Sequence, residues 1–274
     1  MYISNRKIIA LPYAIIIYVS LFALLITFTA KTMGGMIHQI NSAMNQQKSA
    51  SFIQSDSKRS PAIVELFTSE GCSSCPPADK LIGKAQSSFN DKTIVLSYHV
   101  DYWDRLGWKD PYSKSIFSDR QRAYANHLKE SSVYTPQIIV NGETALVGSD
   151  QKALWNAINT YSNSETKEIT ITNIQVNTNH ISFDYAFKNL QKNEELIFEL
   201  VLKSATSQVK NGENKGATLV HTNVVREIAI ANNSKGVITI PLPLNFIKEN
   251  YTIVAFKQTK STLKIEDGLV VQIS

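Results

Sequence analysis

The sequence predicts an α/β domain followed by an all-β sandwich domain, both after an apolar N-terminal segment. Two nearly continuous apolar runs, at 62–67 and 93–100, flank a stretch of helical period, which is typical of buried parallel strands joined by a helix. After about residue 166 the helical period disappears, and short runs of strand length follow one another. The 274 residues exceed the usual size of one domain, so two are expected.

The N-terminal segment 8–30 is 23 residues long and carries no charge. Roughly 20 apolar residues span a bilayer, whereas the apolar part of a secretory signal has roughly 7 to 15 and ends at small residues. Cleavage after Ala30 would place the large Phe28 three residues before the cut. We therefore favour an uncleaved transmembrane anchor over a cleaved signal peptide.

The charges around this segment predict its orientation. Arg6 and Lys7 favour a cytoplasmic location for residues 1–7, although Lys31 on the other side weakens this preference. Either alternative exports the rest of the chain to the periplasm or the cell exterior. Residues 31–60 are rich in Ser, Gln, Asn and Lys and are expected to form a flexible linker.

The α/β domain is expected over residues 61–164. Local patterns predict a strand at 62–67, then a helix with Ala78, Leu81, Ile82 and Ala85 on one face, and then a strand at 93–100. A helix at 113–130 follows, begun by Ser113. A hairpin that turns at Asn141-Gly142 and a helix begun by Ser149 complete the domain. The order predicts a βαβ unit followed by an antiparallel ββα unit.

The β-sandwich domain is expected over residues 165–274. Its strands are predicted from six alternating or apolar runs, "EITITNIQV", "HISFDYAF", "LIFELVL", "GVITIPL", "YTIVAF" and "LVVQI". This half contains no cysteine, so no disulfide is expected in it. The formal charge of +5 is mild and forms no basic stripe with stacking aromatics, which excludes nucleic acid as an expected partner.

The only two cysteines, Cys72 and Cys75, stand in "LFTSEGCSSCPPAD". A disulfide across so short a loop stabilises a fold by only about 2 kcal/mol, against about 4.7 kcal/mol for a 100-residue loop. A zinc site needs four ligands, and no second Cys or His pair stands at short spacing. Redox chemistry is the better interpretation of the pair.

A helix beginning at the pair would favour that chemistry. Unpaired N–H groups and the helix dipole stabilise a thiolate at Cys72, with Ser73, Ser74 and Pro76 in the first turn. Cys72 is thus the expected nucleophile. Cys75, one turn further on, is the expected resolving cysteine.

The CxxC within a βαβ pattern, followed by "TPQIIVNG", resembles the thioredoxin superfamily over residues 61–162. The resemblance implies an α/β thioredoxin-like domain and a cis bond at Pro136, preceded by Thr135, whose free backbone would pair with an extended substrate. An ordinary trans proline opening an edge strand is the alternative. No tryptophan precedes the first cysteine, where Gly71 stands instead, so the redox potential is not implied.

The same resemblance implies a proton acceptor for the resolving thiol. Glu65 is the nearest match to the buried carboxylate of that superfamily, one residue further from Cys72 than in thioredoxin itself. A glutamate turned to solvent is the alternative. More narrowly, "VELFTSEGCSSCPPAD", "SYHVDYWDRLGWKDPY", "VYTPQIIVNG" and "NKGATLVHTNVVR" together are similar to a family of exported thioredoxin-like proteins of unassigned function, over most of residues 62–274.

Polar and aromatic residues follow the second strand, at the edge where ligands bind in open α/β sheets. His99 would hold protons there, supported by Asp101, or complete a copper or zinc site with Cys72 and Cys75; a hydrogen-bonded histidine at the rim is the alternative. Trp103 and Tyr102 would line a substrate groove or pack the loop.

Charged and polar residues elsewhere are expected in solvent. Asp119, Arg120 and Arg122 fit an exposed helix face. His221, Asn223 and Arg226 fit a solvated strand face, and contact with the thioredoxin-like domain is the alternative.

The leading hypothesis is an exported, membrane-tethered thiol–disulfide oxidoreductase. Its substrates would be protein thiols and disulfides, it would use no cofactor beyond the Cys72–Cys75 disulfide, and a redox partner protein would regenerate it because the chain has no third cysteine. The spacing leaves oxidation, reduction and isomerisation open. The alternatives are a copper-binding accessory protein and a non-catalytic binding module.

Overall fold

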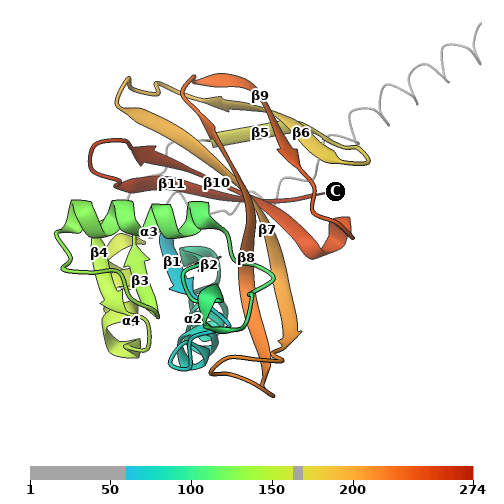
Figure 1. Cartoon of the computed structure of the whole chain (residues 1–274). Coiled ribbons are helices and arrows are strands. Elements are labelled where there is room, and N and C mark those ends of the chain that lie inside the picture. Colours follow the sequence, from blue (N-terminus) through green and yellow to red (C-terminus); the bar gives the residue numbers. More distant parts are fainter. Residues whose placement is uncertain (1–59, 163–168, 274) are drawn as a thin grey trace, which may run out of the picture. The chain divides into compact units, whose positions relative to one another are not determined.

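The computed structural model describes residues 60–162 and 169–273, which all belong to one compact unit. The helices and strands, labelled in Figure 1, are in chain order β1 (Ala62–Thr68), α2 (Pro76–Phe89), β2 (Thr93–His99), α3 (Ser115–Leu128), β3 (Gln137–Val140), β4 (Thr144–Val147), α4 (Gln151–Tyr161), β5 (Ile169–Val176), β6 (His180–Phe187), β7 (Glu194–Gln208), β8 (Thr218–Ala231), β9 (Lys235–Pro241), β10 (Tyr251–Thr259) and β11 (Ile265–Gln272). Short 3-10 helices occupy Asn90–Lys92, Asp104–Leu106 and Lys248–Asn250.

Eight strands form one mixed sheet in the order β11-β10-β7-β8-β2-β1-β3-β4. Strands β1 and β2 are parallel, as the βαβ pattern predicts, and the β3–β4 hairpin is antiparallel to β1. Strand β8 joins the sheet beside β2 through a parallel pair, Ser97 with Val224. Side chains reinforce this junction, because Ser97 Oγ donates to the Thr222 carbonyl at 2.7 Å and Asn223 Nδ2 donates to the Val95 carbonyl at 3.0 Å.

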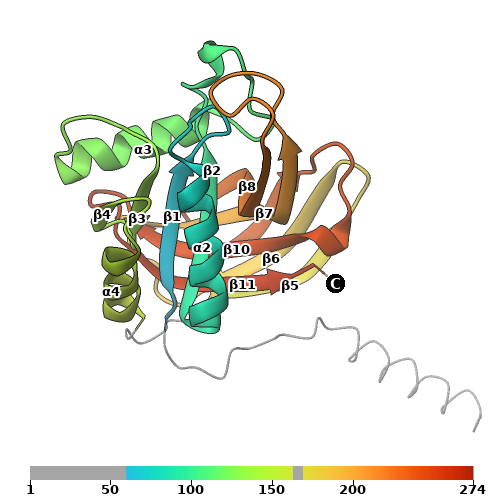
Figure 2. The same ribbon diagram turned by 90° about the horizontal axis from the view of Figure 1, so that it is seen from below.

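Helices cover both faces of the β1 end of the sheet (Figure 2). On one face, α2 and α4 pack on alternate residues of β1 and β3 in a core of Val64, Leu66, Ala78, Ile82, Ile138, Val140, Leu154 and Ile158. On the other face, α3 packs on the intervening residues. That second core also receives side chains from β7, β8, β10 and β11, among them Ile197, Val201, Val225, Val254, Phe256 and Ile265.

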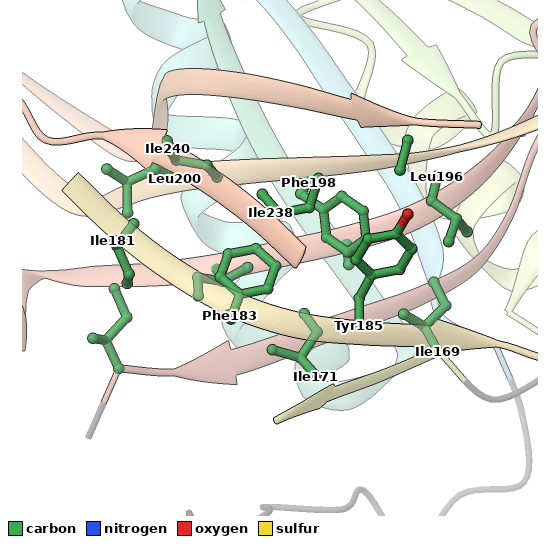
Figure 3. Close-up of a cluster of buried hydrophobic side chains, with 14 of the residues drawn as sticks. Ile169, Ile171, Ile181, Phe183, Tyr185, Leu196, Phe198, Leu200, Ile238 and Ile240 are labelled. Carbon is green, nitrogen blue, oxygen red and sulfur yellow. The ribbon is translucent and has the colours of Figure 1, made fainter. Parts of the chain in front are cut away.

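A second sheet of three strands, β5-β6-β9, packs on the part of the large sheet formed by β7 and β10. Figure 3 shows the side chains that meet between the two layers, with Phe183 and Tyr185 of β6 against Phe198 of β7. The ring centroids of Tyr185 and Phe198 are 5.0 Å apart. Alternation along β5 and β6 places the apolar side chains inward, which is why these segments form half-buried strands.

The predicted division into an α/β thioredoxin-like domain and a separate β-sandwich domain is wrong. Strands from both halves of the chain lie in the same eight-stranded sheet, and one apolar core joins Phe67, Tyr98 and Phe117 to Val225 and Phe256. The physical reason is that β2 would otherwise be an edge strand with unpaired backbone groups, and β8 covers that edge. The six predicted runs do not include β8, although His221 was expected on a strand face, and β7 is longer than its predicted segment.

The predicted transmembrane helix or signal at 8–30 and the predicted linker at 31–60 lie outside the described residues, apart from Ser60. Within residues 60–162 and 169–273, every helix is too short or too polar to cross a bilayer. Helix boundaries also differ slightly from expectation. Lys114 rather than Ser113 precedes α3, and Asp150 rather than Ser149 caps α4, accepting a hydrogen bond from the Ala153 N–H at 2.9 Å.

The β3–β4 turn shows how the two halves fit together. Asn141 and Gly142 have φ of 51° and 70°, and a Cβ placed on Gly142 would lie 1.9 Å from the carbonyl oxygen of Leu263 in the β10–β11 connection. We expect Gly142→Ala to lower the free energy of unfolding by about 2–5 kcal/mol, through positive φ and steric conflict together. Urea denaturation measures it.

Gly107→Ala is the matched control, because Gly107 also has positive φ, 97°, but a Cβ there meets no atom within 4 Å. Its expected cost is about 1 kcal/mol. Equal losses in the two variants would contradict the close contact between the turn and Leu263.

Candidate functional site

The two cysteines lie between the carboxyl end of β1 and the start of α2. A disulfide bond joins Cys72 and Cys75, whose Cα atoms are 5.5 Å apart. Neither residue is exposed to solvent, whereas Ser73 and Ser74 between them are exposed. The loop therefore presents its serines at the surface and keeps both sulfur atoms just beneath it.

Helix α2 begins later than the sequence predicts. Cys75 is its N-cap, and Pro76 and Pro77 fill the first helical positions, where a missing N–H costs nothing. Cys72 lies in the turn before the helix, with the Cys75 N–H donating to its carbonyl at 3.2 Å. The positive end of the helix dipole consequently acts first on Cys75 and reaches Cys72 through this turn.

The segment before β3 lies against Cys72. The Thr135–Pro136 peptide bond is cis, and the Thr135 carbonyl oxygen lies 3.7 Å from Cys72 Sγ. Trp103 Nε1 donates to Thr135 Oγ1 at 2.8 Å, which brings the predicted aromatic loop to the same place. A Cβ on Gly71 would lie 3.2 Å from Trp103 Cβ, so the small residue before Cys72 allows this approach.

The tip of the β7–β8 hairpin holds the backbone on both sides of Cys72. Asn214 Nδ2 donates to the carbonyl oxygens of Glu70 and Cys72, at 2.9 and 2.8 Å. Glu213 Oε2 accepts from the Ser73 N–H at 3.0 Å, and hydrogen bonding from the side chain and then the backbone of Ser73 lowers the pKa of the Glu213 carboxyl. The C-terminal half of the chain thus supplies part of the site, which the sequence did not indicate.

Five buried titratable residues form a carboxylate–histidine cluster beside the loop: Glu70, Asp79, His99, Asp110 and His221. His99 Nδ1 lies 2.7 Å from Asp110 Oδ2, and His221 Nε2 lies 3.3 Å from Glu70 Oε1. His221 Nδ1 is 3.6 Å from Asp79 Oδ2. The two imidazole rings meet edge to face with centroids 4.6 Å apart.

Charge within this cluster shifts the pKa of two members. Burial alone would lower the pKa of His221, but the Asp79 and Glu70 side chains, 3.6 and 3.3 Å from its ring nitrogens, raise it to about 9. Burial alone would raise the pKa of Asp110, but the charge and hydrogen bond of His99 bring it below its ordinary value. At neutral pH, His221 is therefore an imidazolium facing two carboxylates.

The pKa of His221 predicts a pH dependence of stability. A folded-state pKa of about 9 exceeds the ordinary value of 6.5, so the contribution is complete below about pH 6.5 and disappears as pH rises through about 9. We expect up to about 3 kcal/mol of unfolding free energy to be lost across this range, and His221→Gln to remove that loss. Chemical denaturation of both proteins at pH 6 and 9.5 measures it. Parallel pH profiles for the two proteins would contradict it.

The structure does not bring Glu65 to the cysteines. Its side chain lies on the face of β1 that packs on α3, where Oε1 accepts from Arg120 Nε at 2.6 Å and Oε2 accepts from the Tyr124 hydroxyl at 2.5 Å. Arg120 also donates to Gln258 Oε1 of β10 at 3.1 Å. Arg120 was expected on an exposed helix face but instead forms a buried ion pair with Glu65 and a hydrogen bond to the second half of the chain.

The other predicted residues have separate partners. Tyr102 donates to Gln121 at 3.2 Å, and Asp101 accepts from Ser118 Oγ of α3 at 2.5 Å. His99 faces Asp110 and His221 rather than solvent. Across residues 60–162 and 169–273, no group of three or more His, Cys, Asp or Glu side chains is arranged to hold a metal ion, so the copper alternative stays a prediction from sequence.

Several residues of the site were not predicted from the sequence. Glu70 and Asp79 flank the CxxC directly, and their positions in a loop and a first helical turn resemble those of ordinary surface acids. His221 was expected on a solvated strand face but is fully buried. The available signal was its place in "TLVHTNVV", where an alternating pattern puts His221 on the same face as Leu219 and away from exposed Val220.

Comparison with known proteins supports the fold. A family model described as "Protein of unknown function (DUF1223)" matches residues 63–258. No curated protein matches the chain. The match includes both cysteines, the Thr135–Pro136 segment and strand β8, so the family model spans the whole candidate site.

Two solved structures share the fold. The crystal structure of protein AGR_C_4864 from Agrobacterium tumefaciens superposes with a TM-score of 0.58 at 23% identity, covering 78% of this chain and 94% of that chain. HBP35 of Porphyromonas gingivalis gives 0.55 at 14% identity, covering 79% and 76%. A domain of the outer membrane lipoprotein Omp28 from Porphyromonas gingivalis gives only 0.25 at 20% identity, covering 40% and 89%.

Proposed function

We propose that this chain, which belongs to the DUF1223 family of proteins of unknown function, is an exported thiol–disulfide oxidoreductase acting through Cys72 and Cys75. The observation that carries the proposal is the disulfide itself, held in a short loop at the start of a helix with Thr135 beside Cys72. The resemblance of residues 61–162 to the thioredoxin superfamily supports it. The apolar N-terminal segment supports an extracytoplasmic, membrane-tethered location, where disulfides persist.

Cys72 is the sulfur that substrate would attack. Its Sγ lies 3.4 Å from the hydroxyl of exposed Ser74, whereas Cys75 caps the helix beneath it. A substrate thiolate bonds to Cys72 Sγ, the Cys72–Cys75 bond breaks, and Cys75 leaves as a thiolate that takes up a proton. A second substrate thiol, after losing its proton, attacks the substrate sulfur and releases Cys72. The substrate loses two electrons, the protein gains them, and the reverse sequence reduces a substrate disulfide.

Equilibration with glutathione tests the proposal. We expect the Cys72–Cys75 pair of the full chain to exchange with mixtures of reduced and oxidised glutathione, and the chain to accelerate insulin reduction by dithiothreitol. Alkylation and mass spectrometry report the oxidised fraction. A disulfide that neither exchanges with glutathione nor promotes insulin reduction would reject the function.

A non-catalytic binding module is the second candidate, and one observation favours it. Both cysteines are fully buried, so an attacking thiolate reaches Cys72 only after the loop or its cover moves. Asn214 at the hairpin tip opposes this movement through its hydrogen bonds to the loop backbone. The two candidates therefore predict different rates of disulfide exchange in a variant that lacks these hydrogen bonds.

Releasing the hairpin is expected to speed the exchange. Asn214→Ala removes two hydrogen bonds to the loop backbone, each of which contributes about 1 kcal/mol, so attack by glutathione should become about 30-fold faster. Stopped-flow or quenched alkylation measures the rate. Asn193→Ala, which removes a bond to Ser261 instead, is the control. If glutathione exchanges with neither the natural protein nor Asn214→Ala, the binding module is the better interpretation.

A further inference from the structure

His221 belongs to strand β8, yet both of its ring nitrogens face carboxylates that flank the CxxC loop. Nε2 lies 3.3 Å from Glu70 Oε1, and Nδ1 lies 3.6 Å from Asp79 Oδ2. Glu70 stands two residues before Cys72, and Asp79 stands four residues after Cys75. One imidazole from the C-terminal half of the chain thus connects the two ends of the disulfide loop.

The three side chains are removed from water. Glu70 and His221 have no exposed surface, and Asp79 is 4% exposed. Two carboxylates buried this deeply cost free energy of folding unless a cation compensates their charge. Within the described residues, both Glu70 and Asp79 form an ion pair with His221. His99 and Tyr112 also face the His221 ring, with centroids at 4.6 and 5.9 Å.

The remaining contacts of the cluster leave this charge balance unchanged. His99 is paired with Asp110, and Trp108 Nε1 donates a neutral hydrogen bond to Glu70 Oε2 at 2.8 Å. Asp79 also accepts from Thr68 Oγ1 at 3.5 Å, and its Oδ1 has no partner within the described part of the chain. The charge next to the loop consequently depends on whether His221 carries a proton.

We propose that His221 is a positioning residue for disulfide exchange, which offsets one of the two negative charges of Glu70 and Asp79 and so sets how readily Cys72 forms a thiolate. The inference rests on the proposed function, since it assigns a role in the exchange to a residue outside the CxxC loop. Without the imidazolium, two nearby carboxylates would oppose a third negative charge on sulfur. With the imidazolium present, the net negative charge beside the loop is smaller by one unit, so the thiolate forms more readily.

Thiolate titration in charge variants tests the inference. In the reduced full chain carrying Cys75→Ser, Cys72 is the one remaining thiol, so the thiolate absorbance near 240 nm gives its thiolate fraction at each pH. We expect His221→Gln to lower the thiolate fraction at pH 7 by about tenfold, as removal of one nearby charge requires. Asp79→Asn should raise it, and the double variant should lie close to the natural protein.

Asn223→Ala is the matched control for loss of stability. Asn223 lies on the same strand, has φ of 50°, and contacts Gln86 and the Val95 carbonyl without touching a carboxylate. This variant should be less stable yet titrate like the natural protein. A merely structural role for His221 would give the same result in His221→Gln as in Asn223→Ala.

Two results would overturn the inference: an unchanged titration in His221→Gln, or a shift in the same direction in His221→Gln and Asp79→Asn. Should His221→Gln fail to fold, the rise expected in Asp79→Asn decides alone. Failure of the proposed function is separate, because it would appear as a natural protein whose disulfide does not exchange with glutathione, whatever the titrations show.

Discussion

Replacement of Cys72 by serine is expected to abolish thiol–disulfide exchange, reducing insulin turnover to the uncatalysed background. The reason is that Cys72 Sγ lies beside Ser74 and the Thr135 carbonyl, where the substrate is proposed to bind, and an alcohol forms no mixed disulfide. Insulin reduction in the presence of dithiothreitol measures the loss.

Cys75→Ser is the matched variant, because it keeps the nucleophile and removes the resolving thiol. It should accumulate a mixed disulfide between Cys72 and substrate or glutathione, visible as a mass increase that dithiothreitol reverses. A mixed disulfide that forms on Cys75 in the Cys72→Ser protein, but not on Cys72 in the Cys75→Ser protein, would make Cys75 the nucleophile and Cys72 the resolving cysteine. Equal activity of both variants would exclude the mechanism.

Arg120→Met is expected to lower the free energy of unfolding by about 3–5 kcal/mol, the largest stability effect predicted here. Glu65 is completely buried and its carboxylate depends on the Arg120 guanidinium, so the variant leaves an uncompensated charge inside the sheet. The guanidinium also stacks over Phe256 of β10 at 5.7 Å from the ring centroid. The loss should therefore weaken the junction between the two halves of the chain. Urea denaturation measures it.

Two further variants test whether the expected loss comes from the buried Glu65–Arg120 pair. Arg122→Met lies on the same helix, but its pair with Asp119 is exposed, so we expect a loss below about 0.5 kcal/mol. Glu65→Gln combined with Arg120→Met removes both charges and should recover much of the lost stability. Similar losses in Arg120→Met and Arg122→Met would show that the buried pair contributes no more than a surface pair.

A second buried carboxylate belongs to the same region. Burial raises the pKa of Glu199 on β7 to about 8, and the Tyr98 hydroxyl donates to it. Glu199 of β7 pairs with Tyr98, and Glu65 of β1 pairs with Arg120 of α3. These polar groups lie inside an otherwise apolar core. Such a network is favourable only when every member keeps its partner, which is why single replacements there are expected to be severe.

Local elements were predictable because their signals are local. Alternation and apolar runs indicated β1, β2, β5 and β6, and the Asn141-Gly142 pair indicated the turn with positive φ, whereas the start of α2 was expected at Cys72 and lies at Pro76. The turn has three residues rather than two, since Val140 pairs with Thr144. These features depend on neighbours a few residues apart, which a single sequence displays directly.

The site was predictable only in part. The CxxC and its Thr135 neighbour were identified from a motif, whereas Asp79, Asn214 and His221 were not, because their partners stand on other elements. A buried histidine between two acids has the same local sequence as a histidine in solvent. Only the partner, here 151 residues away for Glu70 and His221, distinguishes the two cases.

The sequence by itself determined the closely spaced cysteine pair, the order of strands and helices in the first half, and the β character of the second. The tertiary structure alone decided that β8 lies beside β2, and so that one sheet holds both halves. The physical reason is that alternation encodes which face of a strand is buried but not which strand lies next to it. That choice depends on backbone pairing and charge compensation between residues distant in the chain, such as Ser97 with Val224 and Glu70 with His221.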